Sequence, residues 1–413
     1  DKIKTYIVKS FVCINIFLNH YRSMAVMADS LFAVAKKKGG RAYMKKVWKK
    51  IKEWIPLWCL ILFAFFILAL IVEAVSKRSQ PLADFIHNTS GVVIRAVLAW
   101  CTNLIPFSVA EYLLLASPIL VGLICYAIIR RGRRSAVQGV RCFAGFLSII
   151  SLVYTLFIFG YGTGYYGETV DEKLGLDRHD VSAEELYDTA IALIEKAEAE
   201  LPYVFFPQGT YSAMRFSYGE MNEKLNTAYS RLCDEYPSIQ RLYSRTKPVL
   251  LSEPWTYTHT SGVYSFFTGE ANVNVNYPDY IVISSAAHEM AHQRGITRED
   301  EANFIAFLVC TMSDDAYVRY SGYVDVLNEV MNKLYSADTE LYAAARLRMP
   351  EEIKAEYASY SAFFDKYRES TASKVSGTIN NAYISSHGQP AGIKSYGLVV
   401  DLVVAYMLDG ADA

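Results

Sequence analysis

The chain has 413 residues, of which 52% are hydrophobic and 14% aromatic, and its mean hydropathy of +0.14 is high for a soluble enzyme, which indicates a membrane-embedded part. The net charge of −1 divides unevenly: residues 1–161 carry 21 Lys and Arg against 6 Asp and Glu, a balance of +15, whereas residues 162–413 carry 20 against 36, a balance of −16. No basic, aromatic surface pattern is present, which argues against a nucleic-acid-binding protein.

Residues 1–53 are predicted to form a basic segment in the cytoplasm. Residues 36–52 hold nine Lys and Arg and no acid. Residues 1–35 include the apolar run IVKSFVCINIFL, interrupted by Lys9 and Asn15. This run indicates either an additional helix on the membrane surface or a misplaced start of the chain, and its charges do not fit a cleavable signal peptide.

Three apolar stretches are long enough to cross a bilayer core of roughly 30 Å. They are residues 54–75 (WIPLWCLILFAFFILALIVEAV), 109–129 (VAEYLLLASPILVGLICYAII) and 142–162 (CFAGFLSIISLVYTLFIFGYG). Buried core helices rarely reach this length without charges, so the sequence predicts a three-helix transmembrane region over residues 54–162.

The basic residues predict the direction of the three spans. Residues 130–141, between the second and third spans, carry five Arg and no acid. The loop between the first two spans holds only four charged residues: Lys77, Arg78, Asp84 and Arg95. Because positive charge stays on the cytoplasmic side, we expect the N-terminus inside and everything after Gly162 outside. Residues 91–107, within the first loop, are expected at the membrane interface or packed against the spans.

Residues 163–413 have the pattern of a mostly helical domain. Ser182 and Glu185 form a capping-box pattern at the start of one helix, and another helix is expected over residues 218–236. Residues 261–284 are rich in β-branched and aromatic residues and include an alternation of Asn and Val, which predicts a strand with one polar face. The remaining expected elements are a helix resuming at Ser285, helices over 320–347 and 351–374 separated at Pro350, a loop over 388–397 and a short apolar helix from Gly397.

His288-Glu289-Met290-Ala291-His292 has the spacing HExxH. On a helix, positions i and i+4 share one face, so both imidazoles can reach one ion. The Glu289 carboxylate would lie beside that ion, where it can accept a proton from water. The sequence therefore predicts a Zn²⁺ site with His288 and His292 as ligands and Glu289 as general base. The seven cysteines form no CxxC pair, which argues against a thiolate zinc site.

A catalytic zinc ion needs a third protein ligand. The metzincin pattern HExxHxxGxxH is disfavoured, because Arg298 stands at its third-histidine position. Glu299 shares a helical face with Asn303, which could then hydrogen-bond His288, whereas Glu301 lies about 200° around the same helix. We favour Glu299 as the third ligand and keep Glu301 as the alternative.

The segment Glu299-x-x-Ala302-Asn303-x-x-Ala306 resembles the ExxA(D/N)xxA helix of gluzincin metallopeptidases. The chain is also similar to a bacterial membrane-protein family of unknown function that joins N-terminal spans to an external HExxH domain, with the phrases TGEANVN, HEMAHQRG and EDEAN. The resemblance implies a zincin fold and zinc-dependent hydrolysis, but no substrate. The spacing from His292 to Glu299 is shorter than in gluzincins, and Asn303 replaces their usual Asp. The expected fold class is α+β: a three-helix transmembrane region, then a mostly helical zincin-like domain with a small sheet.

Two further features fit a peptidase. The strand that carries Asn272 and Asn274 lies just upstream of the zinc helix, where zincins have an edge strand that pairs with the substrate backbone. An ordinary sheet strand explains the same pattern equally well. Hydrolysis also needs a donor to the oxyanion, and Tyr396 in the C-terminal loop is our choice over Tyr383 and His387.

The sequence thus predicts a multi-pass protein of the bacterial cell membrane, with a zinc metallopeptidase domain outside the cytoplasm that cleaves proteins or peptides. The alternative is a non-catalytic, metal-stabilised surface sensor or binding module derived from a peptidase. Zinc binding alone does not require Glu289, so its presence favours the enzyme. The sequence does not specify the oligomeric state.

Overall fold

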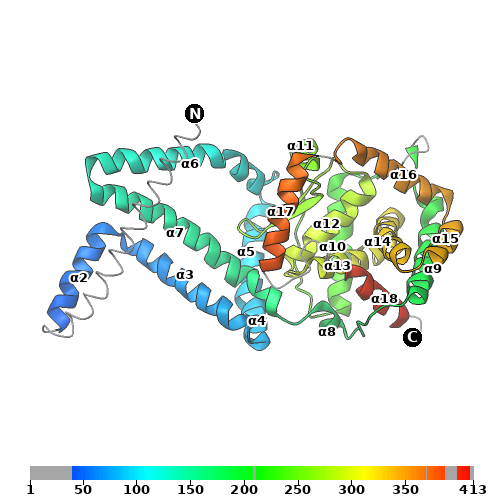
Figure 1. Ribbon diagram of the computed structural model, residues 1–413, viewed down its shortest axis with the longest axis horizontal. Helices are drawn as coiled ribbons and strands as arrows, with labels where there is room; N and C mark the ends of the chain where they lie inside the picture. Colours follow the sequence, from blue (N-terminus) through cyan, green and yellow to red (C-terminus); the bar gives the residue numbers. More distant parts are fainter. Residues whose placement is uncertain (1–39, 208–210, 369, 387–397, 410–413) are drawn as a thin grey trace. The chain divides into compact units, whose positions relative to one another are not determined.

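The computed structural model describes residues 40–207, 211–368, 370–386 and 398–409 (Figure 1). These residues are mostly helical, with one small three-stranded sheet, as the sequence predicts. The segment 1–35 and the loop 388–397 lie outside the described residues.

The described elements follow one another in chain order. They are α2 (Gly40–Trp54), α3 (Leu57–Ser76), α4 (Gln80–Ile86), the π-helix η1 (His87–Gly91), α5 (Val92–Asn103), α6 (Val109–Arg134), α7 (Ala136–Gly160), the 3₁₀ helix η2 (Gly162–Tyr166), α8 (Val170–Leu174), α9 (Ala183–Glu200), the 3₁₀ helix η3 (Leu201–Tyr203), α10 (Tyr218–Glu235), β1 (Lys247–Pro248), α11 (Ser252–Thr256), β2 (Gly262–Ser265), β3 (Glu270–Val273), α12 (Asp279–Gln293), α13 (Glu299–Thr311), α14 (Ala316–Ala337), α15 (Thr339–Arg348), α16 (Glu351–Asp365), α17 (Thr371–Ser386) and α18 (Val399–Asp409).

The chain divides into two compact units. The first comprises the described residues up to Ala64 together with Val121–Ile150, and the second comprises Phe65–Leu120 together with the described residues from Ser151 onward. The predicted division at residues 53 and 162 remains a prediction. Every residue of the candidate site described below belongs to the second unit.

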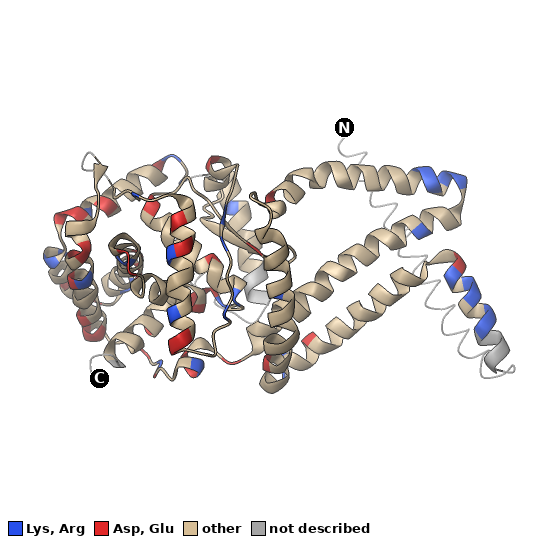
Figure 2. Cartoon of the chain, turned by 180° about the vertical axis from the view of Figure 1, so that it is seen from behind, with Lys and Arg blue, Asp and Glu red and all other residues tan. Residues whose placement is uncertain are grey.

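The three predicted spans are helices. α3, α6 and α7 are each long and apolar enough to cross a membrane, which marks the chain as a membrane protein. Figure 2 shows Lys and Arg along α2 and at the C-terminal end of α6, and few charges along the three apolar helices. The direction in which they cross remains a prediction.

The predicted helices of the second unit are present, with two changes. Ser182 and Glu185 make both hydrogen bonds of a capping box at the start of α9. The helix expected over 320–347 is broken at Asp338, whose side chain accepts hydrogen bonds from two backbone N–H groups of α15. The expected helix over 351–374 is also divided, between α16 and α17.

The strand predicted over residues 261–284 is a β-hairpin followed by the start of a helix. β2 and β3 pair antiparallel, β1 pairs parallel with β3, and the order in the sheet is β1-β3-β2. α12 already begins at Asp279, six residues before the predicted Ser285. Asp279 lies in the first turn of α12, where its negative charge suits the positive end of the helix dipole. The β-branched and aromatic residues that follow Asp279 therefore belong to a helix, although their types are typical of a strand.

Buried carboxylates join the hairpin to the N-terminus of α6. Glu270 accepts hydrogen bonds from the N–H groups of Val109 (2.9 Å) and Ala110 (2.8 Å), and it pairs with Lys247 at 2.6 Å. In return, Glu111 of α6 accepts from the N–H groups that follow β1, at 2.8 and 2.9 Å. An apolar helix is thereby fixed at its N-terminal end to the small sheet.

We expect Glu270→Gln to lower the free energy of unfolding by about 3–5 kcal/mol, because it leaves the Lys247 ammonium buried without its counter-charge. The measurement is thermal unfolding of the full chain in detergent. The matched control is Glu253→Gln, which removes an exposed ion pair to Lys366 and is expected to cost about 0–1 kcal/mol. Equal effects of the two substitutions would contradict a stabilising role for the buried pair.

Candidate metal centre

The helix that carries the HExxH residues, α12, ends at a glycine. Gly295 has φ +95°, and the N–H groups of Gly295 and Ile296 donate to the carbonyls of His292 (2.9 Å) and Ala291 (3.1 Å), the bonds of a Schellman motif. A Cβ at Gly295 would also lie 2.6 Å from the Arg95 guanidinium carbon. Backbone conformation and close packing therefore both require glycine here, and the short turn that follows leads the chain directly into α13.

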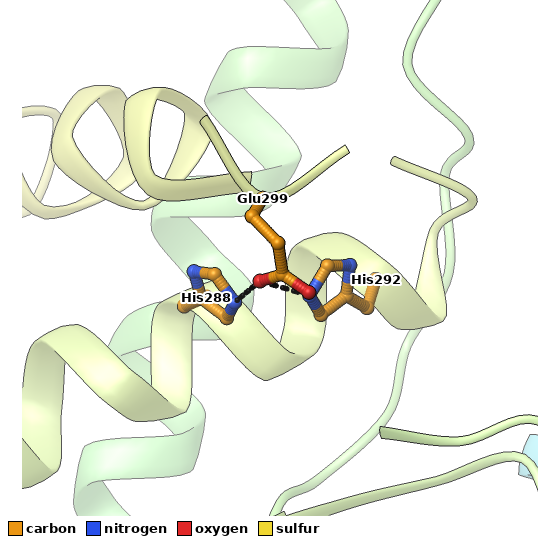
Figure 3. A group of neighbouring side chains, drawn as sticks. All are labelled: His288, His292 and Glu299. Atoms are coloured by element: carbon orange, nitrogen blue, oxygen red, sulfur yellow. Dashed lines mark ion pairs between the residues drawn. The ribbon is translucent and has the colours of Figure 1, made fainter. Parts of the chain in front are cut away.

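The turn places the first residue of α13 over the two histidines (Figure 3). The Glu299 Oε2 atom lies 3.3 Å from His288 Nε2 and 3.5 Å from His292 Nε2. Burial opposes a charge on Glu299, but the two imidazoles hold the pKa of its carboxyl well below the usual range. One potential ligand atom from each of the three residues lies within 4.8 Å of the other two.

The second nitrogen of each imidazole contacts an acceptor. His288 Nδ1 lies 2.7 Å from Asn303 Oδ1, the contact that the sequence predicts. His292 Nδ1 lies 2.6 Å from the Ile296 carbonyl and 2.9 Å from the Tyr161 hydroxyl. An acceptor at each Nδ1 can hold a proton on that nitrogen, which would leave both Nε2 atoms free to bind a metal ion in the space shared with Glu299.

We expect Asn303→Ala to weaken zinc binding about 10- to 100-fold, because His288 loses the acceptor that fixes its tautomer and ring orientation. Zinc affinity would be measured by competition with a chelator. Asn303→Asp retains an acceptor at this position and should keep most of the affinity. A loss that the aspartate variant does not rescue would mean that Asn303 acts through packing alone.

Glu289 lies beside the three clustered groups and is 4% exposed. Burial raises the pKa of Glu289 to about 7, and its Oε2 atom has no hydrogen-bond partner among the described residues. A Cβ at Gly262, the first residue of β2, would lie 2.5 Å from Glu289 Oε1. A glycine at this point lets the strand pass directly alongside the carboxylate.

Glu301, the alternative third ligand, belongs to a different network. Its Oε1 atom accepts from Arg298 Nη1 at 2.8 Å and from the Val170 N–H at 3.2 Å. The carboxylate is buried, and these two donors account for its position. The geometry therefore favours Glu299 over Glu301 for the place beside His288 and His292.

The predicted substrate strand is wrong in one respect. Asn272 belongs to β3, which is the central strand, and Asn274 follows it, so neither lies on a sheet edge. Both amide NH₂ groups donate internally: Asn272 Nδ2 donates to the carbonyls of Val263 and Glu270, and Asn274 Nδ2 donates to Thr256 and Thr260. Asn272 Oδ1 has no hydrogen-bond partner among the described residues, and Asn272 lines the cavity described below. The polar side chains of the Asn–Val alternation therefore donate within the protein, and the edge strands of the sheet are β1 and β2, of which β2 lines the same cavity.

The candidate oxyanion donors are not located by the structure. Tyr396 and His387 lie outside the described residues, and the side chain of Tyr383 is not described either.

A cavity of about 1640 Å³ opens over the histidines. His288, Glu289, His292 and Glu299 line it together with the whole of β2 and residues 371–377 of α17. The edge strand and the candidate metal centre thus share one cavity, large enough for several residues of an extended peptide.

Sequence reasoning missed two supports of the site. Tyr161, which follows α7, reaches His292, and Arg95 of α5 packs under Gly295 while donating to the Gly160 carbonyl at 2.8 Å. Arg95 is 2% exposed. An arginine inside an otherwise apolar segment was the available signal for a buried support.

Residues 87–404 match the family described as "Protein of unknown function (DUF3810)". Comparison with curated proteins and with solved structures found no match.

Proposed function

This chain belongs to the family described as "Protein of unknown function (DUF3810)", and we propose that it is a membrane-anchored zinc metallopeptidase that cleaves proteins or peptides outside the cytoplasm. The observation that carries the proposal is one carboxylate oxygen 3.3 and 3.5 Å from two imidazole nitrogens, next to a buried glutamate with an unpartnered oxygen. The proposal includes a zincin-type arrangement, in which the HExxH helix, the glutamate helix and an edge strand surround the metal.

The three groups fit zinc. Two His nitrogens and one carboxylate are a catalytic donor set, and zinc bonds of about 2.0–2.1 Å in tetrahedral geometry place neighbouring ligand atoms about 3.3–3.4 Å apart. The distances from Glu299 Oε2 to both Nε2 atoms agree with this spacing. His288, His292 and Glu299 would hold the ion and leave its fourth position facing the cavity.

Each remaining group has a role in hydrolysis. When bound, zinc supplies Lewis acidity, which polarises a peptide carbonyl and acidifies water. Glu289, buried beside the three groups with one oxygen unpartnered among the described residues, would take the proton from the attacking water and pass it to the leaving amine. The edge strand β2, which lies against Glu289 at Gly262, would pair with the substrate backbone and hold the scissile bond near the carboxylate.

The proposed orientation places the N-terminus in the cytoplasm and the metal centre outside. It is supported by the basic residues of α2 and of the C-terminal end of α6.

The test is metal content together with peptide hydrolysis by the purified full chain. We expect one zinc per chain, hydrolysis of an unstructured protein such as casein, loss of both on chelation, and recovery of both with zinc. A chain that holds stoichiometric zinc but cleaves none of a broad set of proteins and peptides would instead match the non-catalytic sensor.

A further inference from the structure

Helix α5 carries an exposed apolar stripe. Val93, Val97, Trp100 and Leu104 recur at helical spacing over α5 and its C-cap, and they are 61%, 53%, 67% and 72% exposed. The opposite side of the helix, which includes Arg95, is buried. In sequence, this helix lies between two candidate spans, α3 and α6. An exposed apolar stripe with a central tryptophan, in so short a connection between spans, is typical of a helix that lies in the membrane interface.

The buried side of α5 supports the metal centre directly. A Cβ at Gly269, in the hairpin between β2 and β3, would lie 2.6 Å from the Leu98 side chain, and one at Gly295 would lie 2.6 Å from Arg95. Gly295 is three residues from His292. Only the thickness of α5 therefore separates the end of the HExxH helix from the apolar stripe, and a helix with its side chains is about 10–12 Å across.

The cavity over the metal centre extends to the start of α6. Ala110, Glu111 and Leu114 line it, and Leu114 lies six positions into the helix, about 8 Å along its axis from Val109. Five large apolar side chains of the cavity lining are between 38% and 65% exposed: Leu114, Val263, Phe267, Val375 and Ile379. One wall of the cavity is thus a candidate membrane-spanning helix, and most of the lining surface is apolar, although His259, Thr371 and Lys374 are exposed polar residues of the same lining.

Together these observations limit what reaches the metal centre. An interfacial α5 holds the HExxH helix close to the bilayer surface, and the α6 wall opens the cavity toward the same surface. The edge strand β2 runs along the cavity, which favours an extended polypeptide over a free lipid as the occupant.

We propose that the substrate is the membrane-proximal segment of a membrane-anchored polypeptide, which enters the cavity along α6 and is cleaved within a few residues of its anchor. The proposal rests on the peptidase function proposed above and adds the substrate class.

The experiment compares three peptide pools on the full chain reconstituted in vesicles of phosphatidylcholine and phosphatidylglycerol. Each pool has the same randomised eight-residue segment. It is followed by a four-residue Gly-Ser spacer to a diacylated lysine, by a 40-residue spacer to the same lipid, or by no lipid. The two lipid pools are equally concentrated at the membrane, so their comparison isolates the distance from the anchor.

We expect the short-spacer pool to be cleaved at least tenfold faster than the long-spacer pool. Leu114→Gln should reduce this ratio to about twofold or less. Leu115→Gln makes the same change one position along α6, at an exposed residue outside the cavity lining, and should preserve the ratio. Equal cleavage of the two lipid pools by the wild-type chain overturns the proposed substrate class and leaves the peptidase function intact.

A second readout does not depend on hydrolysis. The short-spacer and long-spacer pools, each carrying a benzophenone beside the randomised segment, would be cross-linked to the Glu289→Gln chain and the adducts mapped by mass spectrometry. Adducts on β2 and the first two turns of α6, in excess with the short spacer, support the proposal. Adducts that are equal for both spacers overturn it. Absence of cleavage in all pools by the zinc-loaded wild-type chain counts against the peptidase function, and the cross-linking result still decides which segment the cavity binds.

Discussion

Glu289→Gln is expected to keep zinc and to lose hydrolysis by about 10²- to 10⁴-fold, the range over which a general base contributes. Glutamine has nearly the same shape, so it still fits beside Gly262, but it cannot accept the proton from water. The two histidines and Glu299 are untouched, and zinc content should therefore equal that of the wild-type chain. The measurement is kcat on a peptide substrate together with metal analysis of the same sample.

The matched control for this prediction is Glu352→Gln, the same chemical change at an exposed position of α16. It should leave both kcat and zinc content unchanged. A Glu289→Gln chain that retained wild-type kcat would remove Glu289 from the proposed mechanism. A variant that lost zinc as well would show that Glu289 contributes to holding the metal.

The second prediction with a large expected effect distinguishes Glu299 from Glu301, the two candidates for the third zinc ligand. Glu299→Gln is expected to weaken zinc binding by more than about 100-fold, because a neutral amide oxygen replaces the charged ligand. This loss is larger than the one expected when a hydrogen-bond partner of a ligand, such as Asn303, is removed. Glu301→Gln should keep zinc, since the Glu301 carboxylate is occupied by Arg298 and the Val170 N–H. Both affinities would be measured by competition with the same chelator.

The Glu301 variant also serves as the stability control. Its substitution leaves Arg298 without a charged partner, so we expect a lower midpoint of thermal unfolding with zinc content unchanged. The opposite pattern, with zinc lost from Glu301→Gln and retained by Glu299→Gln, would reverse the ligand assignment and require α13 to turn by about 200°.

Some supports of the candidate metal centre come from the apolar segments that precede residue 162. Tyr161, which follows α7, contacts His292, Arg95 of α5 lies under Gly295, and Glu270 of the hairpin accepts hydrogen bonds from the start of α6. The family match begins at His87 and so includes all three segments. α5, the start of α6 and the residue that follows α7 therefore help to build the candidate site.

Local patterns in the sequence were sufficient for much of the fold. The three apolar helices follow from the length of their uncharged runs, and the start of α9 follows from Ser182 and Glu185, because each signal acts within one helix. The sheet was harder to predict. The alternation around Asn272 is a real strand pattern, but whether a strand is central or at an edge depends on which other segments pair with it, and the alternation does not encode those partners.

The sequence by itself determined that His288 and His292 share a helical face with Glu289 beside them, since a spacing of four residues on a helix fixes this without reference to other elements. It also determined that Glu299 and Asn303 face the same way. Only the tertiary structure decided that this face meets the histidines, because the direction of α13 is set by the Gly295 turn and by Arg95 packing beneath it. Likewise, the α6 wall of the cavity depends on contacts between residues more than 100 positions apart, which no local pattern of side chains encodes.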